Sequence, residues 1–177
     1  MTRIALLTAD QTPNVAPGFV DRRGGLAVYR LLANAPQLFA GWAHMVDEVL
    51  DSPTFSARMR ELVILRVAAL QGSSYQLGQH RDVGPDTGTS ARQLDALTSG
   101  GDLATGGFDG IELAVLEFVT ELCTTNHLCD DTFARTRDAL GEEAITELLM
   151  LASLYYGLAL VLNAADLELD LRARLRS

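Results

Sequence analysis

The feature that most constrains the fold is a long uncharged stretch near the C-terminus. Residues 148–165 read LLMLASLYYGLALVLNAA and contain no charged side chain. A helix that is apolar on all sides must be buried, and about 18 residues is near the lower limit for spanning a bilayer. Because Ser153, Tyr155 and Asn163 interrupt the run, we expect a helix in the core or at a subunit interface, and no membrane partner.

The rest of the chain shows helical patterning and almost no alternation of the kind typical of strands. Ser52 before Pro53 predicts the start of a helix that continues to about residue 71. Gly72 interrupts the pattern, and a shorter helix is expected over residues 73–83. A capping box predicts a further helix over residues 111–125, because its two members stand three residues apart, at Asp109 and Glu112.

These helices indicate an all-α fold. Residues 1–25 contain several prolines and glycines and are expected to form an irregular N-terminal arm. Helices joined by short loops favour a bundle, and 177 residues suit one domain with a substantial core. We therefore predict a single domain over residues 1–177, built as a helical bundle of seven or eight helices.

Composition and charge exclude several classes of function. The formal charge of −9 argues against nucleic acid and anionic membranes as partners. All basic residues are Arg, so catalysis by a lysine Schiff base and a P-loop lysine are both excluded. With two cysteines and no apolar leader at the N-terminus, the expected location is cytoplasmic.

Residues 60–80, RELVILRVAALQGSSYQLGQH, hold the main clue to function. Positions three, four and seven apart share one face of a helix, so Ser73, Gln76 and His80 are expected to form one stripe. A hydrolytic triad is not expected, because seven helical residues separate Ser73 from His80 by about 10 Å along the axis. Ser73 is instead expected to cap the helix or to bind substrate.

Glu61 and His80 are the candidates for catalysis. Glu61 precedes an almost wholly apolar run, so its carboxylate needs a partner, and contact with His80 would create a pair that moves a proton near neutral pH. The competing interpretation is that Glu61 forms an ordinary ion pair with Arg58 or Arg66, while His80 merely packs.

The spacing of this segment resembles the signature of the carboxymuconolactone decarboxylase family, which includes the alkylhydroperoxidase D-type peroxidases. In that signature a Glu precedes Cys-x-x-Cys-x-x-x-His by twelve residues. Here Glu61 stands twelve residues before Ser73, and the segment continues as Ser73-x-x-Gln76-x-x-x-His80. The resemblance implies an all-helical bundle that assembles as a homotrimer or hexamer. Without the two motif thiols, it implies chemistry other than thiol redox.

The function implied is a cofactor-independent, non-redox lyase that acts on a small carboxylated lactone or carbonyl acid. Decarboxylation, isomerisation and cyclisation, in aromatic breakdown or natural-product biosynthesis, all fit it. Arg66 lies amid apolar residues and is the candidate anion anchor, with a carboxylate from the protein or the substrate expected beside it. Glu61 and His80 would transfer protons, and the residues expected to bind substrate are Ser73, Tyr75, Gln76 and Arg66.

Two alternatives remain open at this point. Cys123 and Cys129 would support a residual thiol peroxidase, and a protein that has lost catalysis would bind a small ligand. His44 and Glu48, one helical turn apart, could form half of a metal site, but no second pair at ligand spacing accompanies them. We therefore expect neither a metal nor an organic cofactor.

Overall fold

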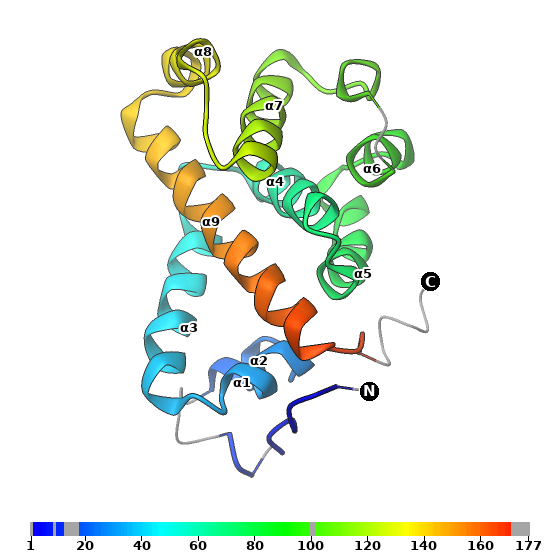
Figure 1. Cartoon of the computed structure of the whole chain (residues 1–177), viewed down its shortest axis with the longest axis vertical. Helices are drawn as coiled ribbons and strands as arrows, with labels where there is room; N and C mark the ends of the chain where they lie inside the picture. Colours follow the sequence, from blue (N-terminus) through cyan, green and yellow to red (C-terminus); the bar gives the residue numbers. More distant parts are fainter. Residues whose placement is uncertain (1, 9, 13–17, 100–101, 171–177) are drawn as a thin grey trace.

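A computed structural model of the chain describes residues 2–8, 10–12, 18–99 and 102–170 (Figure 1). These residues form α-helices and two 3-10 turns and contain no strand, so the predicted all-α fold is confirmed. Part of the expected N-terminal arm, residues 13–17, lies outside the described residues. The elements are α1 (Phe19–Arg22), α2 (Ala27–Leu32), α3 (Pro36–Asp51), α4 (Ala57–Leu70), α5 (Ser74–Val83), η1 (Pro85–Thr87), α6 (Ala91–Thr98), η2 (Leu103–Thr105), α7 (Gly110–Thr125), α8 (Asp130–Leu140) and α9 (Glu142–Ala165).

Helix α4 lies at the centre of the bundle and contacts α5, α6, α7 and α9 (Figure 1). Residues 61–68 of this helix are all buried, which explains why they are apolar apart from Glu61 and Arg66. Its apolar side chains pack mainly against α7 and α9. The main cluster includes Val63, Ile64, Val67, Phe118, Val119, Leu148 and Leu151.

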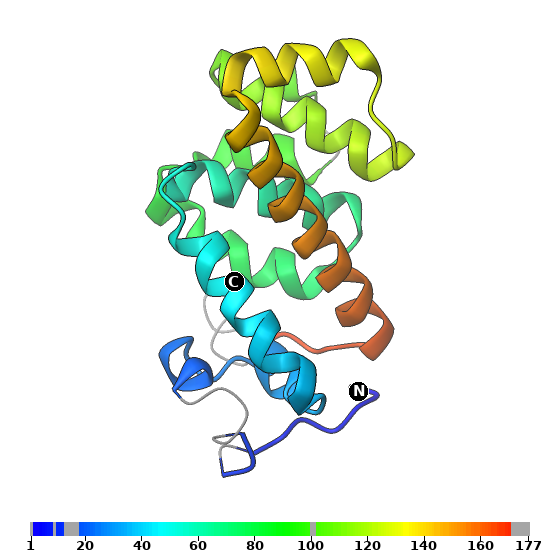
Figure 2. The same cartoon turned by 90° about the vertical axis from the view of Figure 1, so that its left-hand side faces the viewer.

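Helix α9 is the long uncharged helix expected near the C-terminus. It follows Gly141, whose positive φ of 85° suits a glycine, and runs from α8 at one end of the molecule to α2 at the other (Figures 1 and 2). Among the described helices it is the one long and apolar enough to cross a membrane, and 39% of its most apolar window is buried. One side packs on α4, while Met150, Leu160 and Val161 are exposed.

The predicted helix start at Ser52 and Pro53 is wrong. Ser52 follows the end of α3, and α4 begins at Ala57 with Ser56 as its N-cap, whose hydroxyl accepts from the Met59 amide. The Ser52 hydroxyl instead donates to the carboxylate of Glu147 on α9, at 2.6 Å. Tertiary contact therefore overrides a local start signal.

The predicted capping box of α7 is confirmed. The Asp109 carboxylate accepts from the Glu112 amide at 2.8 Å, and the Glu112 carboxylate accepts from the Asp109 amide at 3.2 Å. This reciprocal pair satisfies backbone donors that a helix start otherwise leaves unpaired.

Asp170 fastens α2 to α5. Its carboxylate accepts from the Tyr75 hydroxyl at 2.6 Å, from Gln79 Nε2 at 2.9 Å and from the Ala27 amide at 3.1 Å. The Val28 amide in turn donates to the Tyr75 hydroxyl at 3.2 Å. The first turn of α2 is therefore held by two side chains from distant parts of the chain.

Replacing Asp170 with Ala should loosen the start of α2. The Ala27 amide and the Tyr75 hydroxyl both lose an acceptor, and a lost hydrogen bond of about 1 kcal/mol corresponds to roughly fivefold faster local opening. Hydrogen exchange measured by NMR should therefore speed up at Ala27 and Val28 by that factor or more. Asp138→Ala on the exposed side of α8 serves as the control, and unchanged exchange in the Asp170 variant would contradict the assignment.

Candidate functional site

Glu61 and His80 meet across the α4–α5 hairpin. His80 Nδ1 lies 2.9 Å from Glu61 Oε1 and 3.1 Å from Oε2. Gly72 allows this approach, because its φ of 61° reverses the chain between the two helices. Since a carboxylate only accepts, Nδ1 carries the shared proton and Nε2 is the basic nitrogen of the neutral imidazole. The Glu61 side chain is 6% exposed and that of His80 is 22% exposed.

The competing interpretation of Glu61 is wrong. Arg58 pairs with Glu112, with Nε 2.7 Å from Oε1, rather than with Glu61. Arg66 points toward α6 and α7, where Nε donates to the Thr120 hydroxyl at 2.9 Å and a terminal nitrogen donates to the Leu97 carbonyl at 3.2 Å. Neither arginine pairs with Glu61, and its carboxylate instead forms a hydrogen bond with His80.

No carboxylate of the described residues pairs with Arg66, so the expectation of one from this chain is corrected, while a substrate carboxylate stays a prediction. The guanidinium is buried and is solvated by neutral oxygens, one of them the Leu97 carbonyl in the last turn of α6, where the helix dipole is negative. Burial lowers the pKa of Arg66. Arg66 does not line the cavity beside His80.

An enclosed cavity of about 50 Å³ adjoins His80. Its walls come from α2, α3, α5 and α9 and are mostly apolar and aromatic. A cavity of roughly 150 Å³ holds benzene, so side chains must shift before a ring can enter this one. The lining residues are Leu26, Val28, Tyr29, Trp42, Val46, Tyr75, Gln76, Gln79, His80, Leu154, Tyr155, Leu158 and Leu162.

The other residues expected to bind substrate occupy different environments. The rings and amides of Tyr75 and Gln76 line the cavity, but the Tyr75 hydroxyl is taken by Asp170. Gln76 Nε2 donates to the Tyr155 carbonyl at 3.1 Å, which leaves Gln76 Oε1 buried without a described partner. Ser73 stands at the N-cap of α5, yet its buried hydroxyl makes no capping bond and does not line the cavity.

Sequence reasoning missed Tyr155 and Trp42 as lining residues. The Tyr155 ring meets the His80 ring edge to face, with centroids 5.7 Å apart and planes at 81°. Burial raises the pKa of Tyr155, so its hydroxyl stays protonated. Because α9 is apolar all round, periodicity did not distinguish the inward-facing Tyr155 from its neighbour Tyr156.

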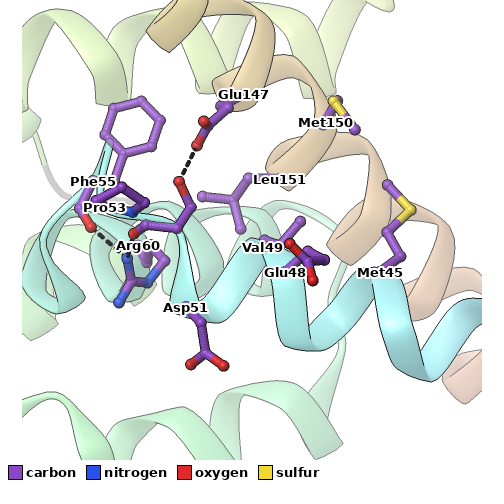
Figure 3. Close-up of a pocket in the computed structure, with 11 residues that line it drawn as sticks. Met45, Glu48, Val49, Asp51, Pro53, Phe55, Arg60, Glu147, Met150 and Leu151 are labelled. Atoms are coloured by element: carbon purple, nitrogen blue, oxygen red, sulfur yellow. Dashed lines mark hydrogen bonds between the residues drawn. The ribbon is translucent and has the colours of Figure 1, made fainter.

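A larger hollow of about 390 Å³ lies between the end of α3 and α9 (Figure 3). Its polar groups hold the connection between α3 and α4 in place. The Glu147 carboxylate accepts from the hydroxyls of Ser52 and Thr54, both at 2.6 Å. Arg60 donates to the Ser52 carbonyl at 2.8 Å. Since these groups already have partners and the histidine–carboxylate pair lies elsewhere, the smaller cavity is the candidate site.

The remaining candidate groups lie away from this cavity. His44 Nδ1 and Glu48 Oε1 are 3.8 Å apart on the exposed face of α3, and no cluster of three metal-binding side chains occurs in the described part of the chain. Cys123 is buried in α7, and burial raises the pKa of its thiol to about 11. Cys129 is exposed at the start of α8.

The fold and the site together define a helical-bundle protein with a histidine–carboxylate pair at an enclosed cavity. Residues 36–121 match the model of the carboxymuconolactone decarboxylase family, and this segment, from α3 into α7, contains both members of the pair. The match to this family model over residues 36–121 agrees with the resemblance of the motif. No functionally curated protein matches the sequence.

Several solved structures share the fold over nearly the whole chain. The debrominase Bmp8, solved with 2,3,4-tribromopyrrole, is 15% identical with a TM-score of 0.83, covering 99% of this chain and 95% of that one. A peroxidase-related protein from Silicibacter is 12% identical with a TM-score of 0.80, covering 97% and 93%. An alkylhydroperoxidase D core protein from Ralstonia eutropha is 15% identical with a TM-score of 0.78, covering 98% and 95%. At these identities the likeness establishes the fold alone.

The two thiols should differ in reactivity. Only the thiolate reacts with iodoacetamide, and each unit of raised pKa lowers its fraction about tenfold below that pKa. At pH 8 the folded protein should therefore be alkylated at the exposed Cys129, while Cys123 reacts only after unfolding in urea or as the pH approaches about 11. Peptide mass spectrometry distinguishes the two sites, and equal labelling of both in the folded protein would contradict this assignment.

Proposed function

We propose that the protein is a cofactor-independent, non-redox lyase or isomerase of the carboxymuconolactone decarboxylase type that moves protons on a small ring-shaped carbonyl compound. The observation that carries the proposal is the contact of 2.9 Å between His80 Nδ1 and the buried Glu61 carboxylate, beside an enclosed cavity. A fixed and partly desolvated pair of this kind is suited to general acid–base catalysis.

Glu61 and His80 together could remove a proton from the substrate and return it to another atom. His80 Nε2 would take a proton from the carbon next to the substrate carbonyl, and the electron pair of the broken C–H bond would move into the conjugated carbonyl. The imidazolium, stabilised by Glu61, would then return the proton to another carbon, giving isomerisation. In decarboxylation the same carbonyl would accept the electrons of the broken C–C bond, and His80 would protonate the carbon that lost carbon dioxide.

The lining favours a flat and largely apolar ring. Tyr29, Trp42 and Tyr155 offer aromatic faces and edges, whereas Arg66 lies outside the cavity. A carboxylate on the substrate would therefore be balanced by protonated His80, and a lactone with at most one such group fits better than a multiply charged acid. Bmp8, which has the same fold, was solved with a flat ring compound, a halogenated pyrrole.

Isomerisation of α-angelica lactone to β-angelica lactone tests the proposal, because it requires removal of a proton next to the carbonyl and its return elsewhere. Loss of the base at His80→Ala should lower the rate about 10²- to 10⁴-fold, and Glu61→Gln should lower it as well because the imidazolium loses its partner. Ultraviolet absorbance of the conjugated product follows the reaction, and circular dichroism checks folding.

A Cys123→Ser, Cys129→Ser double variant is the matched control, and it should keep the wild-type rate. A residual thiol peroxidase would instead lose its activity toward hydroperoxides in this variant. Wild-type rates in both Glu61→Gln and His80→Ala would overturn the acid–base proposal. Binding of the lactone without turnover by the wild-type protein would favour a ligand-binding role.

We further propose that a second copy of the chain covers the open side of α9, giving a homo-oligomer such as a trimer or hexamer. Leu160 and Val161 of α9 are 54% and 42% exposed, and Leu38 at the start of α3 is 74% exposed. Soluble proteins rarely leave adjoining apolar side chains uncovered. Sedimentation equilibrium should therefore give a multiple of the chain mass, and a monomer at micromolar concentration would contradict this proposal.

A further inference from the structure

Tyr155 carries a hydroxyl that forms no hydrogen bond with any of the described residues. The side chain lines the cavity with His80 and is 6% exposed. The hydroxyl of Tyr75, on the same cavity, both donates to Asp170 and accepts from the Val28 amide. The Tyr155 hydroxyl has no such partner among the described residues, so it is a polar group available to a ligand.

The position of Tyr155 is fixed relative to His80. Its ring packs edge to face against the imidazole, with centroids 5.7 Å apart. Its backbone carbonyl accepts from Gln76 Nε2 at 3.1 Å, which ties this turn of α9 to the helix that carries His80. The ring and the base therefore face the same small volume from two different helices.

Tyr155 is also in the protonation state of a donor. Burial raises the pKa of its hydroxyl, and the negative charge of Glu61 adds to the effect. The hydroxyl therefore keeps its proton at neutral pH, as a hydrogen-bond donor must.

We propose that the Tyr155 hydroxyl donates a hydrogen bond to the carbonyl oxygen of the substrate, an inference that rests on the proposed function of the same site. When His80 Nε2 takes the proton, the C–H electron pair forms a carbon–carbon double bond and the carbonyl π electrons move onto oxygen. The hydroxyl stabilises this oxyanion without giving up its own proton. Tyr155 then selects substrates whose carbonyl lies next to the carbon that loses the proton.

Two other lining residues carry donors without a described partner, the Tyr29 hydroxyl and the Trp42 indole. Both belong to an aromatic cluster with Phe19 and Phe39 at the far side of α2 and α3, with the rings of Tyr29 and Trp42 6.2 Å apart. Of these three side chains in the described part of the chain, Tyr155 is the one whose ring packs against the imidazole of His80, so it is the donor assigned to the reacting carbonyl.

Tyr155→Phe removes the hydroxyl and keeps the ring. Loss of one oxyanion donor should lower kcat for α-angelica lactone about 10²- to 10³-fold with little change in KM. Tyr156→Phe is the matched control, since Tyr156 lines a different hollow and its hydroxyl lies 3.5 Å from Asn126 Oδ1. A kcat in Tyr155→Phe equal to that of Tyr156→Phe and of the wild-type protein would overturn the assignment.

A second measurement separates this inference from the proposed function. The carbonyl stretching frequency of bound γ-butyrolactone, which the site cannot isomerise, should be lowered by the hydrogen bond in wild-type and His80→Ala proteins and restored in Tyr155→Phe. A frequency unaffected by Tyr155→Phe overturns the role of Tyr155 alone, because the loss of turnover in His80→Ala would still stand. Failure of the wild-type protein to bind either lactone overturns both proposals.

Discussion

The hydrogen bond between Glu61 and His80 is the interaction on which the packing of α5 against α4 depends. A carboxylate in the middle of α4 is costly unless a charged or hydrogen-bonding partner meets it inside the protein. The turn at Gly72 folds α5 back onto α4 and supplies the imidazole. Arg58, Arg60 and Arg66 all have other partners, so the Glu61 carboxylate pairs with His80.

The same arrangement places the Glu61–His80 pair and Arg66 on different sides of α4. Arg66, on the opposite side of α4, is engaged by Thr120 and the end of α6, and the buried thiol of Cys123 lies on that side as well. The cavity side is formed by α2, α3, α5 and α9, whose aromatic side chains enclose His80. The proposed acid–base site would therefore lie at one face of α4, while the other face serves packing.

Local sequence signals predicted much of the fold, and long-range contacts account for what they missed. The apolar run over residues 148–165 and the Asp109 capping box depend on periodicity and neighbouring residues, so the sequence was sufficient for both. The pairing of Glu61 with His80 was expected from motif spacing. Ser52 failed as a helix start because Glu147, distant in sequence, binds its hydroxyl. Tyr155 was missed because α9 has no polar face that would reveal which side points inward.

The tautomer of His80 tests the central claim most directly. Nitrogen-15 NMR of the imidazole in the neutral state should show a protonated Nδ1 that donates to Glu61 and an unprotonated Nε2. Glu61→Gln should change the Nδ1 signal and leave the fold intact. A neutral His80 protonated at Nε2, with a signal insensitive to Glu61→Gln, would contradict the account.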